Sequence, residues 1–132
     1  MFSASRQLMF YASVERDGLV EASKIQSDKT PGLMMGEWTH VAMTFNEGKV
    51  AFYYNGEPVG EVQSMPDGMT SVTAIADLGV GMFRGLVSSP GISHLDDFGF
   101  FAETVLSPAE IARIYEKGLM GSGVLGSVRK DR

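Results

Sequence analysis

The sequence contains no cysteine among its 132 residues. This absence excludes disulfide bonds, zinc sites built on thiolates and cysteine nucleophiles, but it leaves the cellular compartment open. Basic residues are also few, because 11 Lys and Arg stand against 16 Asp and Glu, for a net charge of −5. An acidic chain is a poor partner for nucleic acid, whose phosphates select basic surfaces.

Targeting segments and long apolar runs are missing as well. Residues 1–6 show no basic flank followed by an apolar run of signal-peptide length. The most apolar stretch, residues 78–87, is interrupted by three glycines and an arginine. This stretch is too short to span a bilayer. We therefore expect no membrane partner.

What is present indicates one all-β domain with a hairpin at its centre. A chain of this length supports a single core, and its 16 glycines suit frequent turns. Apolar side chains alternate along two runs, as a half-buried strand requires. The side chains predicted to share one face are Thr39, Val41, Met43, Phe45, Val50, Phe52 and Tyr54. Gly48 and the pair Asn55-Gly56 predict tight turns, so a meander should continue into a third strand at 57–62. Pro58 predicts that this third strand lies at an edge.

Further strands are predicted on both sides of this centre. Strands at 6–14 and 19–25 should be joined by an Asp17-Gly18 turn, and two more are expected at 72–80 and 93–101. The segments predicted to be loops or irregular are 26–36, 63–71 and 81–91.

One helix is predicted, at Pro108–Lys117. Ser107 is a good N-cap, Pro108 suits the first helical position, and Glu110 completes a capping box with Ser107. Gly118 is the expected C-cap. Residues 121–132 are predicted to form a flexible tail, and residues 1–120 are predicted to form the domain.

Two segments carry a family likeness. The first is Glu37-Trp38-Thr39-His40-Val41-Ala42, followed after a loop by Val50-Ala51-Phe52-Tyr53-Tyr54-Asn55-Gly56. The second is Leu95-Asp96-Asp97-Phe98-Gly99-Phe100-Phe101, followed by Leu106-Ser107-Pro108-Ala109-Glu110-Ile111. In order and spacing these segments resemble the core, the closing strand and the short helix of laminin-G-like domains in the concanavalin A-like lectin/glucanase superfamily. The likeness covers residues 6–118, and the usual first strands of the family are lacking.

The resemblance implies an antiparallel β-sandwich, a concanavalin A-like jelly roll, that binds carbohydrate or a protein partner at the cell surface or after secretion. The lacking strands would leave a sheet edge open for pairing. We therefore hypothesise a homodimer formed by edge pairing or strand exchange. A structural or assembly domain that completes a larger chain is the alternative function.

The sequence does not predict an enzyme. The glucanases of the same fold cluster carboxylates at alternate positions of one strand, so that an acid and a nucleophile flank one glycosidic bond. No Glu-x-Asp-x-x-Glu run occurs, and the histidines, His40 and His94, form no Ser-His-Asp order or metal-spaced pair. His40 is expected to be packed and hydrogen-bonded. A degenerate glycoside hydrolase is the weaker alternative.

Aromatic residues provide the candidate ligand contacts. Trp38, Tyr53 and Tyr54 could stack on the apolar face of a sugar ring, although a tryptophan in this motif more often belongs to the core. Phe83 and Arg84 lie in a glycine-rich segment, where binding residues often gather.

Asp96 and Asp97 are the candidate metal ligands. Neighbouring side chains on a strand point to opposite faces, so at most one of the two serves any single site. The alternative is a structural carboxylate that accepts backbone N–H bonds. No cofactor is expected other than a structural calcium. Calcium takes six to eight oxygen ligands, and no loop rich in aspartate supplies them.

Overall fold

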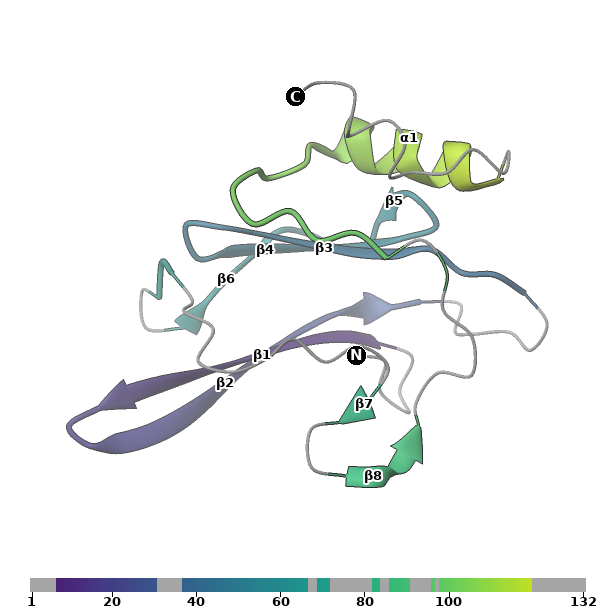
Figure 1. Ribbon diagram of the computed structural model, residues 1–132. Helices are drawn as coiled ribbons and strands as arrows, with labels where there is room; N and C mark the ends of the chain where they lie inside the picture. The colour runs from purple at the N-terminus through teal and green to yellow at the C-terminus, as the bar shows by residue number, and fades with distance from the viewer. Residues whose placement is uncertain are drawn as a thin grey trace.

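The computed structural model describes residues 7–30, 37–66, 69–71, 82–83, 86–90, 96 and 98–119. Within these ranges the chain forms strands paired in antiparallel sheets and one helix near the C-terminus (Figure 1). The elements are β1 (Gln7–Arg16), β2 (Leu19–Lys29), β3 (Val41–Asn46), β4 (Lys49–Tyr54), β5 (Glu57–Pro58), β6 (Gln63–Ser64), β7 (Met82–Phe83), β8 (Leu86–Pro90) and α1 (Pro108–Leu119). The predicted all-β class with one short helix is confirmed.

Strands β1 and β2 form a long hairpin around the predicted Asp17-Gly18 turn. The two turn residues have φ angles of 51° and 78°, the left-handed pair that a tight hairpin requires. Strand β2 continues to Lys29, so the predicted loop at 26–36 is wrong over its first four residues. The polar residues there stay in the strand because Ser27, only 2% exposed, accepts a hydrogen bond from the Leu8 amide at 2.9 Å through its hydroxyl.

The central sheet is built around β4. Strand β3 pairs with β4 in the predicted register, from Asn46 opposite Lys49 to Val41 opposite Tyr54. On its other side β4 pairs first with β5 and then with β6. The predicted strand at 57–62 is therefore corrected to a two-residue strand, with Pro58 at the edge as expected. The ladder is interrupted after it because Gly60 adopts a left-handed φ of 77°.

The main core lies between the central sheet and the β1–β2 hairpin, which runs beneath the sheet in Figure 1. Its buried members are Leu8, Ala12, Ile25, Val50, Phe52 and Met65. Phe45 joins it through Phe10, with ring centroids 5.9 Å apart. The predicted inward face is confirmed at Val50 and Phe52, but Val41 and Met43 on that same face remain 45% and 42% exposed. The hairpin therefore covers only part of the sheet.

Helix α1 covers the opposite face of the central sheet (Figure 1). Its capping box is confirmed: the Ser107 amide donates to the Glu110 carboxylate at 2.7 Å, and the Glu110 amide donates to the Ser107 hydroxyl at 3.3 Å. The bond from the Ser107 amide lowers the pKa of Glu110 below its ordinary value. The helix runs through Gly118 to Leu119, so Gly118 is not the C-cap. Its φ is not in the left-handed region that such a cap uses.

The later part of the chain departs from the predicted pattern. No strand occurs at residues 96 and 98–101, the described part of the predicted 93–101 strand, and Phe100 is 71% exposed. An alternating pattern makes a strand only where a neighbouring strand supplies the hydrogen bonds. Strands β7 and β8 form a small hairpin within the segment predicted to be irregular. The predicted strand at 72–80 and the predicted tail at 121–132 lie outside the described residues. Among the described residues, helix α1 is not long and apolar enough to cross a membrane.

Candidate functional site

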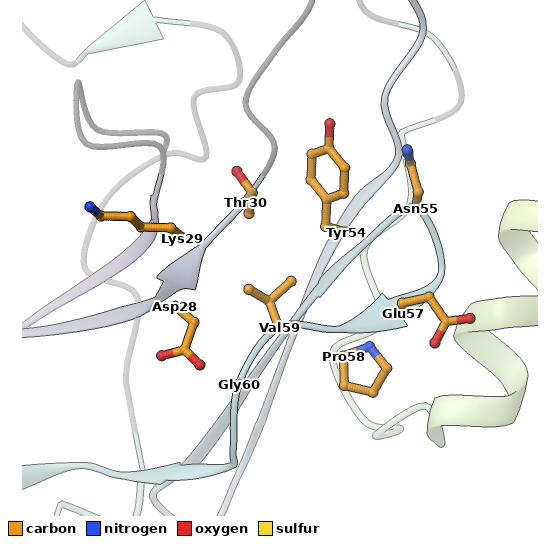
Figure 2. Close-up of a pocket in the computed structure, with 9 residues that line it drawn as sticks. All are labelled: Asp28, Lys29, Thr30, Tyr54, Asn55, Glu57, Pro58, Val59 and Gly60. Carbon is orange, nitrogen blue, oxygen red and sulfur yellow. The ribbon is translucent and has the colours of Figure 1, made fainter.

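A hollow of about 530 Å³ opens where the end of β2 meets the turn between β4 and β5 (Figure 2). This volume lies in the range of roughly 300–1,000 Å³ that is usual for small-ligand sites. The hollow is lined by Asp28, Lys29, Thr30, Tyr54, Asn55, Glu57, Pro58, Val59 and Gly60. These residues combine one aromatic ring with apolar and hydrogen-bonding groups.

The turn fixes Asn55 on the wall of the hollow. Asn55 and Gly56 have φ angles of 50° and 81°, so the chain reverses within two residues. The Asn55 amide group donates from the backbone to the His40 carbonyl at 2.8 Å, and its side-chain Oδ1 accepts from the His40 backbone N–H at 2.9 Å. With Oδ1 engaged, the Nδ2 group offers its two donors to the outside.

The carboxylate of Asp28 lies against the backbone of Gly60. A Cβ atom added at Gly60 would lie 2.8 Å from both Cγ and Oδ2 of Asp28. An added Cβ would therefore force the Asp28 carboxylate to move, and the left-handed φ of Gly60 favours glycine at this position. Asp28 is exposed and, when ionised, can only accept hydrogen bonds.

Tyr54 supplies the aromatic surface of the hollow. Its ring is half-buried and stands between Thr30 and Asn55 in Figure 2. Tyr54 belongs to the core face of β4, opposite Val41, but lies toward the end of the sheet that remains open. Val59 adds apolar surface between Tyr54 and Asp28, and Pro58 adds more beside Glu57, so the hollow has a polar group toward each end and an apolar middle (Figure 2).

The charged side chains give the hollow a weakly negative character. Lys29 and Glu57 both point away from the middle, toward opposite sides of Figure 2. Two carboxylates, Asp28 and Glu57, stand against the single ammonium of Lys29. In the described ranges no three His, Asp or Glu side chains gather as a metal ion would require.

The structure separates the aromatic residues that the sequence proposed. Trp38 is 71% exposed, so it is not a core residue, and it does not line the hollow. Tyr53 is 4% exposed and points to the helix side of β4. A covered ring has no open face for a sugar, so Tyr53 is a packing residue, and Tyr54 is the aromatic residue that lines the hollow.

Four further residues were proposed as site residues from the sequence, and the structure describes two of them. Phe83 lies in β7, and Asp96 is exposed in a segment without secondary structure. Arg84 and Asp97 lie outside the described residues. The sequence predicts a loop at Asp28 and only a turn at Asn55, so neither residue stands out as a site residue before the structure is seen. The sequence signal for the site was an aromatic residue directly before an Asn-Gly turn.

His40 lies behind the turn, against the helix. Its ring centroid is 5.9 Å from that of Tyr115. Burial lowers the pKa of His40 below its ordinary value of 6.5. The Nδ1 atom is buried and has no hydrogen-bond partner in the described part of the chain. The prediction of a packed histidine is confirmed, but its hydrogen bonds to Asn55 come from the backbone rather than from this ring atom.

Comparison with protein families gives one match. The model of a laminin G-like family, described as the concanavalin A-like lectin/glucanases superfamily, matches residues 2–112. Curated proteins and solved structures gave no significant match.

Proposed function

The chain belongs to the laminin G-like family of the concanavalin A-like lectin/glucanases superfamily, and from this premise we propose that it is a non-catalytic module that binds carbohydrate. Members of this family have the β-sandwich fold and are typically binding modules. The hollow beside Tyr54 is the proposed binding site.

The observation that carries this proposal is the mixture of groups that line the hollow. A sugar has an apolar C–H face that packs against an aromatic ring, and it has hydroxyls that both donate and accept hydrogen bonds. Tyr54 offers a ring, Asp28 an acceptor and Asn55 donors, all along one hollow (Figure 2). Apolar sites with a few well-placed polar groups are the usual form of small-ligand sites.

The arrangement of carboxylates supports binding without hydrolysis. The superfamily includes glucanases, but the laminin G-like family is mostly non-catalytic. Glycoside hydrolysis requires two carboxyl groups on either side of one bond. In the hollow, Asp28 and Glu57 lie on opposite sides of Val59 and Pro58 and point apart (Figure 2).

A glycan array followed by an assay for reducing ends tests the proposal. We expect the folded protein to bind a subset of glycans, and we expect no new reducing ends when it is incubated with a bound polysaccharide. Binding should weaken on substitution of Tyr54. Release of sugar would contradict the non-catalytic reading. Absence of binding to every glycan would contradict carbohydrate as the ligand and favour a protein partner.

A second candidate function is assembly, and the edge of β3 favours it. In the described sheet β3 pairs only with β4, so its other edge carries backbone groups open to a further strand. Val41 and Met43, both large and more than 40% exposed, lie on this same strand. We propose a homodimer through this edge as the alternative. Light scattering during size-exclusion chromatography decides it: a monomer at all concentrations contradicts the dimer.

A further inference from the structure

From the charge and the hydrogen-bonding pattern of the hollow, we infer that it selects uncharged saccharides and rejects sulfated and uronic acid-containing ones. This inference rests on the proposed function and adds the ligand class. It depends on Asp28, Asn55, Tyr54 and the charges near them, and each contributes in a different way.

Asp28 requires the ligand to bring a hydrogen-bond donor. Its carboxylate lies against the Gly60 backbone, where a Cβ atom would approach Oδ2 to 2.8 Å, and this places it at one end of the hollow. An ionised carboxylate accepts hydrogen bonds and donates none. A ligand group at this end must therefore be a donor, and neighbouring sugar hydroxyls are donors, whereas sulfate and carboxylate groups are not.

Asn55 and Tyr54 determine which ligand groups fit the other end of the hollow. Because the His40 backbone N–H occupies Oδ1 of Asn55 at 2.9 Å, the outward group of this side chain is its donating nitrogen. In Figure 2 the Asn55 nitrogen and the Tyr54 hydroxyl are directed to the same side. A sugar packed on the Tyr54 ring would meet the Asn55 donor with a ring or hydroxyl oxygen, which an uncharged sugar supplies.

Electrostatics separate the uncharged sugars from the acidic ones. The hollow is lined by two carboxylates and one ammonium, and because Lys29 and Glu57 both point away from its middle, Asp28 is the remaining charged group. The whole chain carries a net charge of −5, which adds to the repulsion of anions at moderate salt. An anionic glycan would bring its charge toward Asp28, while the Lys29 ammonium points away from the middle of the hollow.

A binding comparison between neutral and sulfated glycans tests the inference. The glycans are presented on one array, and the strongest binders are measured in solution by calorimetry. We expect signal from neutral glycans and none from sulfated or uronic acid-containing ones. Asp28→Asn should weaken binding of the neutral ligand by about ten- to a hundredfold, since it exchanges an ionised acceptor for an amide. Tyr54→Leu, which keeps an apolar side chain but removes the aromatic ring, should weaken it also.

Glu47→Gln is the matched control. It removes the same charge from an exposed position at the far end of β4, roughly 20 Å from Tyr54 along the strand. This variant should bind like the wild type. Preference for acidic glycans, or binding unchanged in folded Asp28→Asn and Tyr54→Leu proteins, overturns the inference while leaving carbohydrate binding intact. Failure to bind any glycan overturns the proposed function, and the inference with it.

Discussion

The two faces of the central sheet are held to the rest of the molecule in different ways. Toward the β1–β2 hairpin, β4 presents Val50 and Phe52, which are 0% and 3% exposed within a cluster whose buried members come from β1, β2, β4 and the segment after β6. Toward α1, the contact is narrower. The helix backbone lies so close to Gly56 that an added Cβ would lie 3.3 Å from the Cα of Ala112.

Packing on the hairpin side of the sheet therefore depends on the volume of apolar side chains. Packing on the helix side depends on the close approach of α1 to the turn at Gly56. Removing volume should damage the hairpin face most, because its side chains fill the core. Adding volume should damage the helix face most, because a glycine lets the helix approach the turn. Substitutions that remove or add volume on each face separate these two modes.

The largest effect is expected for Phe52→Ala. It leaves a cavity in the hairpin-side core and should lower the free energy of unfolding by about 3–5 kcal/mol. Chemical denaturation measures this change. Met43→Ala on the neighbouring strand, same face, is the control, because Met43 is 42% exposed and should cost much less. Equal losses for the two variants would mean that the hairpin face is not held by buried volume.

The next effect concerns the helix face, and the turns supply a matched pair. Gly56→Ala would bring a Cβ to 2.9 Å from the Tyr115 ring and also strain a φ of 81°. Gly18→Ala meets the same strain, at a φ of 78°, but has nothing within 4 Å. We expect a loss of about 1 kcal/mol for Gly18→Ala and about 2–4 kcal/mol for Gly56→Ala.

Thermal or urea unfolding of the two glycine variants gives the comparison. The difference between them reports how tightly α1 is seated on the turn, since the backbone strain is shared. Similar losses in both variants would show that the helix yields readily.

A smaller effect, of opposite sign, is expected at the end of α1. Gly118 lies within the helix, is exposed and would have no atom within 4 Å of an added Cβ. Gly118→Ala should therefore stabilise the protein by about 0.5–1 kcal/mol, because alanine loses less conformational freedom in a helix. A rise in the thermal midpoint is the readout. A fall would indicate that the helix ends before Gly118 in solution.

The smallest effect is a pH dependence that originates at His40. Burial lowers its pKa in the folded state below 6.5, so the folded protein favours the neutral ring while the unfolded chain takes up a proton more easily. The stability contributed is therefore complete above pH 6.5 and is lost as the pH falls from 6.5 through the folded-state pKa. The group of α1 that faces the ring is the aromatic side chain of Tyr115.

Urea midpoints measured between pH 5 and pH 8 test this dependence. His40→Phe keeps an aromatic ring but cannot titrate, so subtracting its profile from that of the wild type isolates His40 from His94 and the carboxylates. Parallel profiles for the two proteins would contradict the assignment.

Local features of the fold were predicted from the sequence, and features that depend on distant segments were not. The Asp17-Gly18 turn and the Ser107–Glu110 capping box follow from chemistry within four residues, and both are present as predicted. The extension of β2 depends on a Ser27 hydrogen bond across the hairpin, and the break after Pro58 depends on Gly60.

The candidate site was predicted least well, for the same reason. The sequence named Tyr54 as an aromatic candidate, but the hollow also needs Asp28 from β2 beside Gly60 from the segment after β5. No local sequence pattern predicts such a contact between segments that are distant in the chain. Tyr53 and Tyr54 are equal candidates by composition, and only the position of α1 decides which ring is covered.

The three tight reversals at Asp17-Gly18, Glu47-Gly48 and Asn55-Gly56 also imply an order of assembly. Each joins neighbours in the chain, and isolated hairpins close in roughly 1–10 μs, so both ribbons are expected to exist before any distant contact is made. Domains fold while synthesis proceeds from the N-terminus, and all three reversals precede α1. During translation α1 is therefore expected to form last. It then docks onto the β3–β4–β5 ribbon, where Gly56 leaves room for its close approach.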